Sequence, residues 1–168
     1  YNADVGTPHE PQTNGIAERA IRRLKEGTKC LLEQAGLDMS YWADAMRAFT
    51  FSRNIHDLVD DGEGKKASTP YQLRFGKPFR GEVVPFGSYV EYLMVDDREK
   101  RKHHTFEPKT SPAIFMGYSV RTGGPWSGDY LVLPFSAIEE ATAHSSVYLK
   151  KVRTIKVPPK LTFPLKTG

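Results

Sequence analysis

The stretch "PQTNGIAERAIRRLKEG", residues 11–27, decides how the N-terminal part of the chain folds. Its turn-forming residues end at Asn14 and Gly15, and from there apolar side chains recur every three or four residues as far as Gly36. This spacing predicts one long amphipathic helix. Its expected apolar face comprises Ala17, Ala20, Ile21, Leu24, Thr28, Leu31, Leu32 and Ala35.

A polar stripe follows the other side of the same helix. Glu18 begins the stripe, which continues through Arg22, Lys25 and Lys29 at helical spacing. An acid in the first turn ordinarily complements the positive end of the helix or pairs with a base one turn on, here Arg22. That interpretation explains Glu18 alone, but not the turn before it or the basic residues after it, which suit a phosphate backbone.

A second helix is expected directly after the first. Ser40 is a suitable N-cap for a helix over roughly residues 41–56. Its bulky apolar face is predicted to consist of Trp42, Ala45, Met46 and Phe49. We expect the two helices to form a hairpin that packs against a further layer.

The character of the chain changes after the second helix. Residues 56–68 are charged and contain glycine, which predicts a loop, and the Thr-Pro pair at 69–70 opens a short helix that stops at Gly76. Beyond Pro85, period-two segments predict a small antiparallel sheet or barrel, and the tail from residue 158 is expected to fray. The strand segments are "SYVEYLMV", "PAIFMGYS", "DYLVLPF" and "SSVYLKKV".

Charge is distributed unevenly along the 168 residues. Residues 1–85 carry 12 Lys and Arg against 12 Asp and Glu, and residues 86–168 carry 12 against 8, so the formal net charge of +4 belongs to the C-terminal half. Basic residues cluster at positions 19–29, 98–102 and 150–156, where they form either solvated surfaces or a footprint for a polyanion.

The cysteine count and the hydropathy indicate in which cellular compartment the protein is expected. Cys30 is the single cysteine, so no intrachain disulfide is possible and an intracellular, nuclear or cytoplasmic location is expected. No apolar run reaches membrane-spanning length and no leader is visible, so no membrane partner is expected. Because the chain begins with Tyr1, we expect a fragment or a processed piece.

Several segments together resemble one protein family. "PQTNGIAER" is similar to the P-x-x-N-G-x-x-E-R segment that carries the last acidic motif of retroviral and retrotransposon integrases. "SYWADAMRAFTFSRN" and "TPYQLRFGKPF" resemble the W-A-E-A helix and the T-P-Y-E-L-W-x-G-K-P segment of copia-type elements. "PFGSYVEYL" and "SPAIFMGYS" resemble the F-G-C and G-I-F-L-G-Y strands of their SH3-like domain. The resemblance covers about residues 7–150 in the family's order.

The resemblance implies an α+β chain with two domains. Residues 1–56 would be the C-terminal helices of a ribonuclease-H-like integrase core, and residues 57–85 a linker with a short helix. Residues 86–157 would be a small antiparallel SH3-like β-barrel, followed by a tail at 158–168.

The resemblance also implies a chemistry for the polar stripe. Integrases of this family cut and join DNA with two Mg²⁺ or Mn²⁺ ions held by three carboxylates, and hard cations of this kind take oxygen ligands. Glu18 would be the catalytic, metal-binding third carboxylate. The residues implied to contact element ends or target DNA are Asn14, Gly15, Arg19, Arg22, Lys25 and Lys29. Self-association is implied for the full integrase.

The family's other two carboxylates are aspartates on upstream strands, and this chain lacks them. Asp4 does not match their place in the motif. We therefore expect the isolated chain to be catalytically inactive, which a strand-transfer assay with Mn²⁺ tests. A second hypothesis stays open, namely a non-catalytic nucleic-acid- or chromatin-binding module, a domesticated remnant. An aspartate-bearing strand two or three dozen residues before Glu18 in an extended reading frame would favour the enzyme.

Two further groups of residues carry side chains that are common in binding sites. His103 and His104 lie in a basic segment without a cysteine partner, which favours a polar loop over a zinc site. Tyr118, Trp126 and Tyr130, with Arg121 nearby, either bind bases or a proline-rich peptide or serve as structural residues of the sheet, and the structural role is favoured.

Overall fold

The long helix predicted after Asn14 is the first element of the structure, a computed structural model that describes residues 14–60, 62–64, 66–95, 100, 104–140 and 147–166. This helix, α1, spans Gly15–Ala35. It ends at Gly36, where a left-handed φ of 68° lets the N–H groups of Gly36 and Leu37 both donate to the Leu32 carbonyl. The predicted helix and its stop at Gly36 are confirmed.

The second helix is capped differently from the prediction. A 3₁₀ turn, η2 Met39–Tyr41, leads into α2, Trp42–His56. The Asp38 carboxylate accepts a hydrogen bond from the Ser40 N–H at 2.8 Å, so Asp38 and not Ser40 provides the cap. The extra turn moves the capping position two residues upstream.

The buried face of α2 is rotated from the predicted one. Ala45, Ala48 and Phe51 are buried, whereas Trp42 is 53% exposed. Of the predicted face only Ala45 is buried. Small alanines allow close approach, and α2 packs against both α1 and the strand β4, Thr110–Val120, so the alanine stripe turns inward and the bulky tryptophan does not.

The short third helix follows its sequence signals closely. α3 spans Pro70–Phe75, Thr69 caps its first turn through the side-chain oxygen, and Gly76 ends it with a φ of 71°. The loop predicted before it instead contains a two-stranded antiparallel pairing of β1, Val59–Asp60, with β2, Lys66–Ser68.

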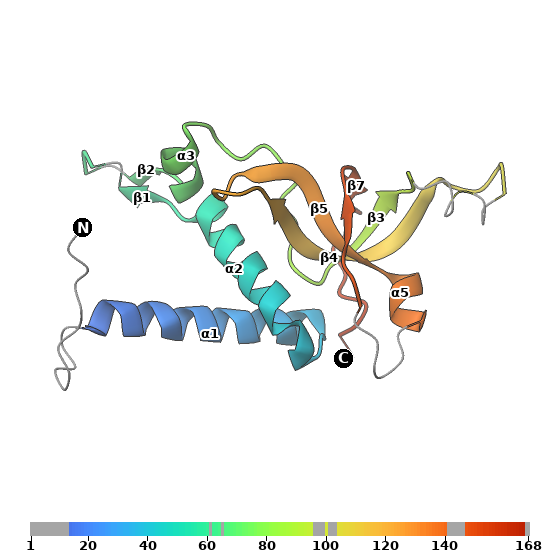
Figure 1. The fold of residues 1–168 in the computed structure, drawn as a ribbon, viewed down its shortest axis with the longest axis horizontal. Helices are drawn as coiled ribbons and strands as arrows, with labels where there is room; N and C mark the ends of the chain where they lie inside the picture. Colours follow the sequence, from blue (N-terminus) through green and yellow to red (C-terminus); the bar gives the residue numbers. More distant parts are fainter. Residues whose placement is uncertain are drawn as a thin grey trace.

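The C-terminal half forms a five-stranded antiparallel sheet in the order β6-β5-β4-β3-β7 (Figure 1). The α+β class is therefore confirmed. β6 and β7 are joined by only two residues, yet they pair at opposite edges, and no ladder joins them within the described residues. The sheet is thus open and not the closed barrel that was expected. The strands are β3 Tyr89–Leu93, β4 Thr110–Val120, β5 Trp126–Pro134, β6 Lys150–Val152 and β7 Ile155–Lys156, and α5 Phe135–Glu140 follows β5.

The sheet is covered on both faces, so the middle of β4 is buried without alternation. Ile114 and Met116 belong to the hydrophobic cluster under α1 and α2. Phe115 and Tyr118 belong to a second cluster, which also contains side chains of α2 and α3. A β-bulge between Phe115 and Gly117 shifts the alternation of side chains between the two faces by one residue. Tyr118 therefore lies in the second cluster with Phe115.

The C-terminal segment, residues 158–166, is part of the packed structure. The Tyr89 N–H donates to the Thr162 carbonyl at 2.9 Å, and Leu165 packs in the cluster beneath the helices. A Cβ at Gly36 would lie 2.3 Å from the Leu165 carbonyl oxygen. The prediction of a frayed tail is wrong, because this segment closes the gap between the end of α1 and the sheet.

Candidate nucleic-acid interface

Glu18 lies in the first turn of α1 with its side chain exposed. It forms no ion pair with Arg22, although Arg22 follows at helical spacing, and it has no hydrogen-bond partner within the part of the chain that the structure describes. The helix fixes the position of the backbone from which this side chain projects. Glu18 is therefore available to a cation or a donor from outside the described residues.

The residues just before Glu18 are open as well. Asn14 occupies the N-cap position, but its side chain makes no capping hydrogen bond. Gly15 has no atom within 4 Å of the position that a Cβ would take, so crowding inside the chain does not explain this glycine. Both residues present free surface at the start of the helix.

The predicted basic residues are brought together on α1, because the helix is regular throughout. All four are exposed. The Arg19 Nε donates to the Gly15 carbonyl at 3.2 Å, and the Lys29 ammonium lies 3.9 Å from the Glu33 carboxylate, a solvent-exposed contact of little strength. Arg22 and Lys25 form no ion pair among the described residues. The stripe can therefore offer cationic groups to a polyanion.

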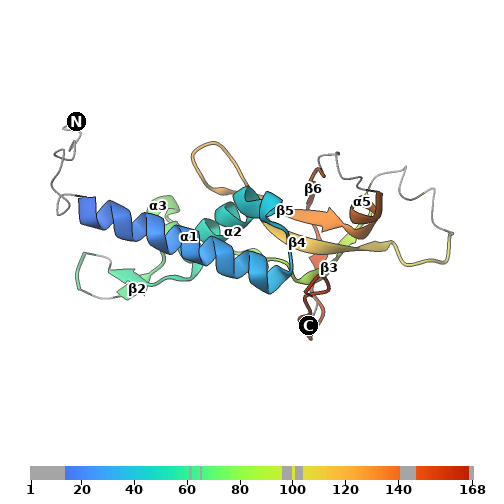
Figure 2. The same cartoon turned by 90° about the horizontal axis from the view of Figure 1, so that it is seen from below.

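The apolar side of this half of α1 is uncovered. Ile16 is 82% exposed and Ile21 54% exposed, whereas Leu32, about three turns beyond Ile21, is only 3% exposed. Figure 1 shows that the N-terminal part of α1 extends away from the sheet, and in Figure 2, seen from below, α1 crosses α2 near the other end. The surface beside Glu18 thus has an apolar side that lacks a packing layer.

The described residues contain no cluster of three or more His, Cys, Asp or Glu side chains. Glu18 is therefore not part of such a cluster in this part of the chain. His104 lies in a turn in which its backbone N–H donates to the Glu107 carboxylate at 3.1 Å, and His103 lies outside the described residues. A metal site would need ligands in addition to those described.

The aromatic residues of the sheet have structural roles. The Tyr118 hydroxyl donates to the Glu82 carbonyl at 2.8 Å and accepts from the Val84 N–H at 3.2 Å, and the Tyr130 hydroxyl accepts from the Glu82 N–H. Burial raises the pKa of Tyr118 to about 12, because the phenolate would lose its hydration. The two tyrosines fix the segment before β3, so the structural interpretation of Tyr118 and Tyr130 is confirmed.

Trp126 is likewise engaged within the protein. Its indole Nε1 donates to the Asp129 carbonyl at 2.9 Å, and its backbone N–H donates to the Tyr71 hydroxyl at 3.2 Å. The sequence alone does not reveal this structural role of Tyr71, because the contact joins α3 to the start of β5 across 55 residues. Within the described residues, the exposed Arg121 side chain makes one long contact, 3.5 Å, to the Ser127 carbonyl.

The fold is α+β, and the candidate surface consists of an exposed carboxylate followed by cationic residues on the same helix. Known proteins that are similar in sequence to this chain are much longer than it. It is 28% identical over 115 residues to the retrovirus-related Pol polyprotein from transposon RE2 of Arabidopsis thaliana, and 27% identical over 116 residues to that from transposon RE1 of the same plant. Each match covers 67% of this chain and 7% of the relative.

A tobacco protein gives a third match of the same kind. The retrovirus-related Pol polyprotein from transposon TNT 1-94 of Nicotiana tabacum is 28% identical over 116 residues, which is 66% of this chain and 8% of that protein. No family model and no solved structure matches the chain. The homologues of the chain are retrovirus-related Pol polyproteins of transposons, and the chain spans less than a tenth of their length. Within the described residues, no helix is long and apolar enough to cross a membrane.

Proposed function

We propose that the chain is the C-terminal part of a copia-type retrotransposon integrase, which acts in metal-dependent DNA strand transfer when the upstream part of its catalytic core is present. The observation that carries the proposal is Glu18, an exposed carboxylate without a partner among the described residues, followed by a cationic stripe on the same helix. Homology to transposon Pol polyproteins supports the assignment. A nuclear location, where target DNA lies, belongs to the same proposal.

Glu18 would contribute one ligand to a Mg²⁺ or Mn²⁺ site, and two carboxylates from upstream strands would complete it. Divalent ions in such a site activate the attacking hydroxyl and stabilise the leaving oxygen of a phosphodiester. The role of this chain is to hold the carboxylate on a rigid helix and to place Arg22 and Lys25 one and two turns away, where they can bind the DNA backbone.

The uncovered apolar side of α1 supports the same assignment. Upstream strands that supply two carboxylates beside Glu18 would also supply a surface for the exposed Ile21. One layer would then complete both the site and the packing of the helix.

The test of catalysis uses a polypeptide extended upstream by the rest of the core. We expect strand transfer on a labelled oligonucleotide with Mn²⁺, and we expect Glu18→Gln to lower it by on the order of a thousandfold or more, because the variant loses a metal ligand. Glu26→Gln changes a second exposed carboxylate of α1 and is expected to keep the activity. Full activity of Glu18→Gln would refute the assignment.

The test of DNA binding uses the salt dependence of affinity. If Arg22 and Lys25 each contact one phosphate, the double variant Arg22→Ala with Lys25→Ala should reduce the slope of log affinity against log salt by about 1.8. Lys77→Ala with Arg80→Ala makes the same charge change at exposed positions outside α1 and should leave the slope unchanged. Equal slopes for all three proteins would exclude contact through the helix.

The second candidate function, a non-catalytic nucleic-acid-binding module, is favoured by one observation. Leu32, Ala45 and Leu133 share a hydrophobic cluster, so the helices pack on the sheet of this chain without upstream strands. An extended polypeptide without strand transfer, combined with salt-dependent DNA binding by the chain itself, would support this function over the first.

A further inference from the structure

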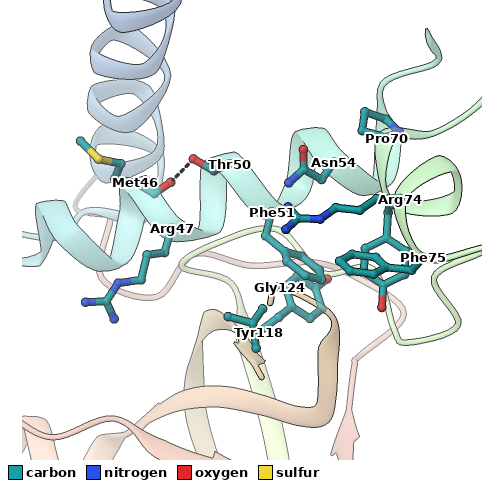
Figure 3. A pocket seen from close by; sticks show the side chains of 12 residues that line it. Met46, Arg47, Thr50, Phe51, Asn54, Pro70, Arg74, Phe75, Tyr118 and Gly124 are labelled. Atoms are coloured by element: carbon teal, nitrogen blue, oxygen red, sulfur yellow. Dashed lines mark hydrogen bonds between the residues drawn. The ribbon is translucent and has the colours of Figure 1, made fainter. Parts of the chain in front are cut away.

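Two hollows meet along α2. The larger, about 500 Å³, lies between α2, α3 and the β4–β5 turn (Figure 3). The smaller, about 300 Å³, lies between α1 and α2. Thr50 and Asn54 line both hollows, so the two hollows adjoin on either side of these side chains and belong to one surface of the three helices. We call it the arginine groove, after the four arginines that line it: Arg23, Arg47, Arg53 and Arg74.

The charged side chains of the groove are positive. Among the described residues, every charged side chain that lines it is an arginine and none is a carboxylate. Arg47 and Arg53 have aspartate partners on α2 and at its C-cap. Arg23 and Arg74 form no ion pair within the described residues, and both are exposed. Two guanidinium groups, one in each hollow, thus remain available to carboxylates from outside.

The floor of the larger hollow is aromatic, but its rings are already covered by one another. Phe51 stacks on Tyr118 with ring centroids 4.6 Å apart, and it meets Tyr71 edge-to-face at 5.9 Å. The Arg74 guanidinium lies 5.3 Å from the centroid of the Phe75 ring. A nucleobase needs an open ring face for stacking, whereas an apolar side chain needs only an apolar hollow. The hollow therefore suits a large apolar side chain better than a base.

A polar group for backbone recognition lies between the two hollows. Figure 3 shows Arg74 reaching from α3 toward α2, where Asn54 lies. The Asn54 side chain is exposed and makes no hydrogen bond within the described residues. The nearby Thr50 hydroxyl is already used, because it donates to the Met46 carbonyl at 2.9 Å. An amide both donates and accepts, so Asn54 can pair with the peptide group of an extended chain.

We propose that the arginine groove binds an acidic peptide segment of a partner protein, one in which a large apolar residue is flanked by carboxylates. The apolar side chain enters the hollow above Phe51 and Tyr71, and the carboxylates on either side bind Arg74 and Arg23. Neither arginine belongs to the stripe that begins at Glu18, so this binding is independent of the proposed catalytic role.

The experiment measures fluorescence anisotropy of a short labelled peptide with a central tryptophan flanked by aspartates. We expect saturable binding that Arg74→Glu or Arg23→Glu weakens by about tenfold or more, because each variant replaces an attraction by a repulsion. Lys77→Glu makes the same charge change outside the groove and should have little effect. Replacing the central tryptophan by serine at constant peptide charge should also weaken binding by about tenfold.

Two results would overturn the proposal. One is equal binding of the tryptophan and serine peptides, which would reduce the interaction to unspecific charge attraction. The other is binding of single-stranded oligothymidine that displaces the peptide and is lost in Arg74→Glu, which would make the groove a nucleic-acid site. Glu18→Gln should bind the peptide like the parent chain, so failure of the integrase assignment leaves this measurement unchanged.

Discussion

The contact between the C-terminal segment and the end of α1 predicts an unusually costly glycine substitution. Gly36 and Gly76 both end helices in left-handed conformations, with φ of 68° and 71°. Alanine in this conformation costs about 1 kcal/mol at either position. At Gly36 the new Cβ would also lie 2.3 Å from the Leu165 carbonyl oxygen, whereas at Gly76 it meets nothing within 4 Å.

The difference between the two variants measures the contact of the C-terminal segment. Displacing the half-buried Leu165 forfeits about 1 kcal/mol of apolar burial, so Gly36→Ala should cost about 2 kcal/mol and Gly76→Ala about 1 kcal/mol. The entropy that alanine removes from the unfolded chain is the same in both and cancels. Urea unfolding followed by circular dichroism gives the free energies.

A truncated chain that ends at residue 158 provides the control. Without the C-terminal segment, the free-energy cost of Gly36→Ala should fall to that of Gly76→Ala, because only the cost of the left-handed backbone conformation remains. Equal costs of the two substitutions in the full chain would refute the reasoning, since the close approach would then carry no energy.

Three further predictions concern buried and exposed groups. Tyr118→Phe should cost about 1 to 3 kcal/mol in urea unfolding, because two backbone partners lose their hydrogen bonds, whereas Tyr89→Phe, which loses one long contact of 3.4 Å, should cost little. Burial raises the pKa of Tyr118 from 10.0 to about 12, so the folded state holds this proton more tightly than the unfolded state. The contribution of Tyr118 to the free energy of unfolding should be full below pH 10 and fall by about 2 to 3 kcal/mol toward pH 12. The Tyr118→Phe variant should lack this fall. Leu32→Ala should cost about 2 to 5 kcal/mol and Ile21→Ala less than about 0.5 kcal/mol, and a larger cost at Ile21 in this chain would show that the N-terminal half of α1 is covered after all.

Local signals in the sequence were sufficient for parts of the fold. The Asn-Gly start and Gly36 stop of α1, and the Thr-Pro start and Gly76 stop of α3, depend on backbone chemistry within one turn and were predictable. The placing of Glu18 and the basic stripe on one exposed side of α1 followed from helical spacing alone. That Glu18 binds metal, and that the stripe binds DNA, stay predictions.

Other features depend on packing between distant segments. The alanine stripe of α2 is buried because α1 and β4 both approach it, which no pattern within α2 reveals. The bulge in β4 and the docking of Leu165 likewise require the rest of the fold. The arginine groove joins side chains of α1, α2 and α3, and each arginine alone reads as an ordinary surface residue.

The docking of residues 158–166 has a consequence for how the chain acquires its structure. The end of α1 is synthesised well before Leu165, so their contact becomes possible only when the last described residues have left the ribosome. Contacts of such large sequence separation form late and slow the overall reaction. The surface beside Gly36 should therefore stay open until that moment, although the helices can already pack on the sheet through their buried cluster.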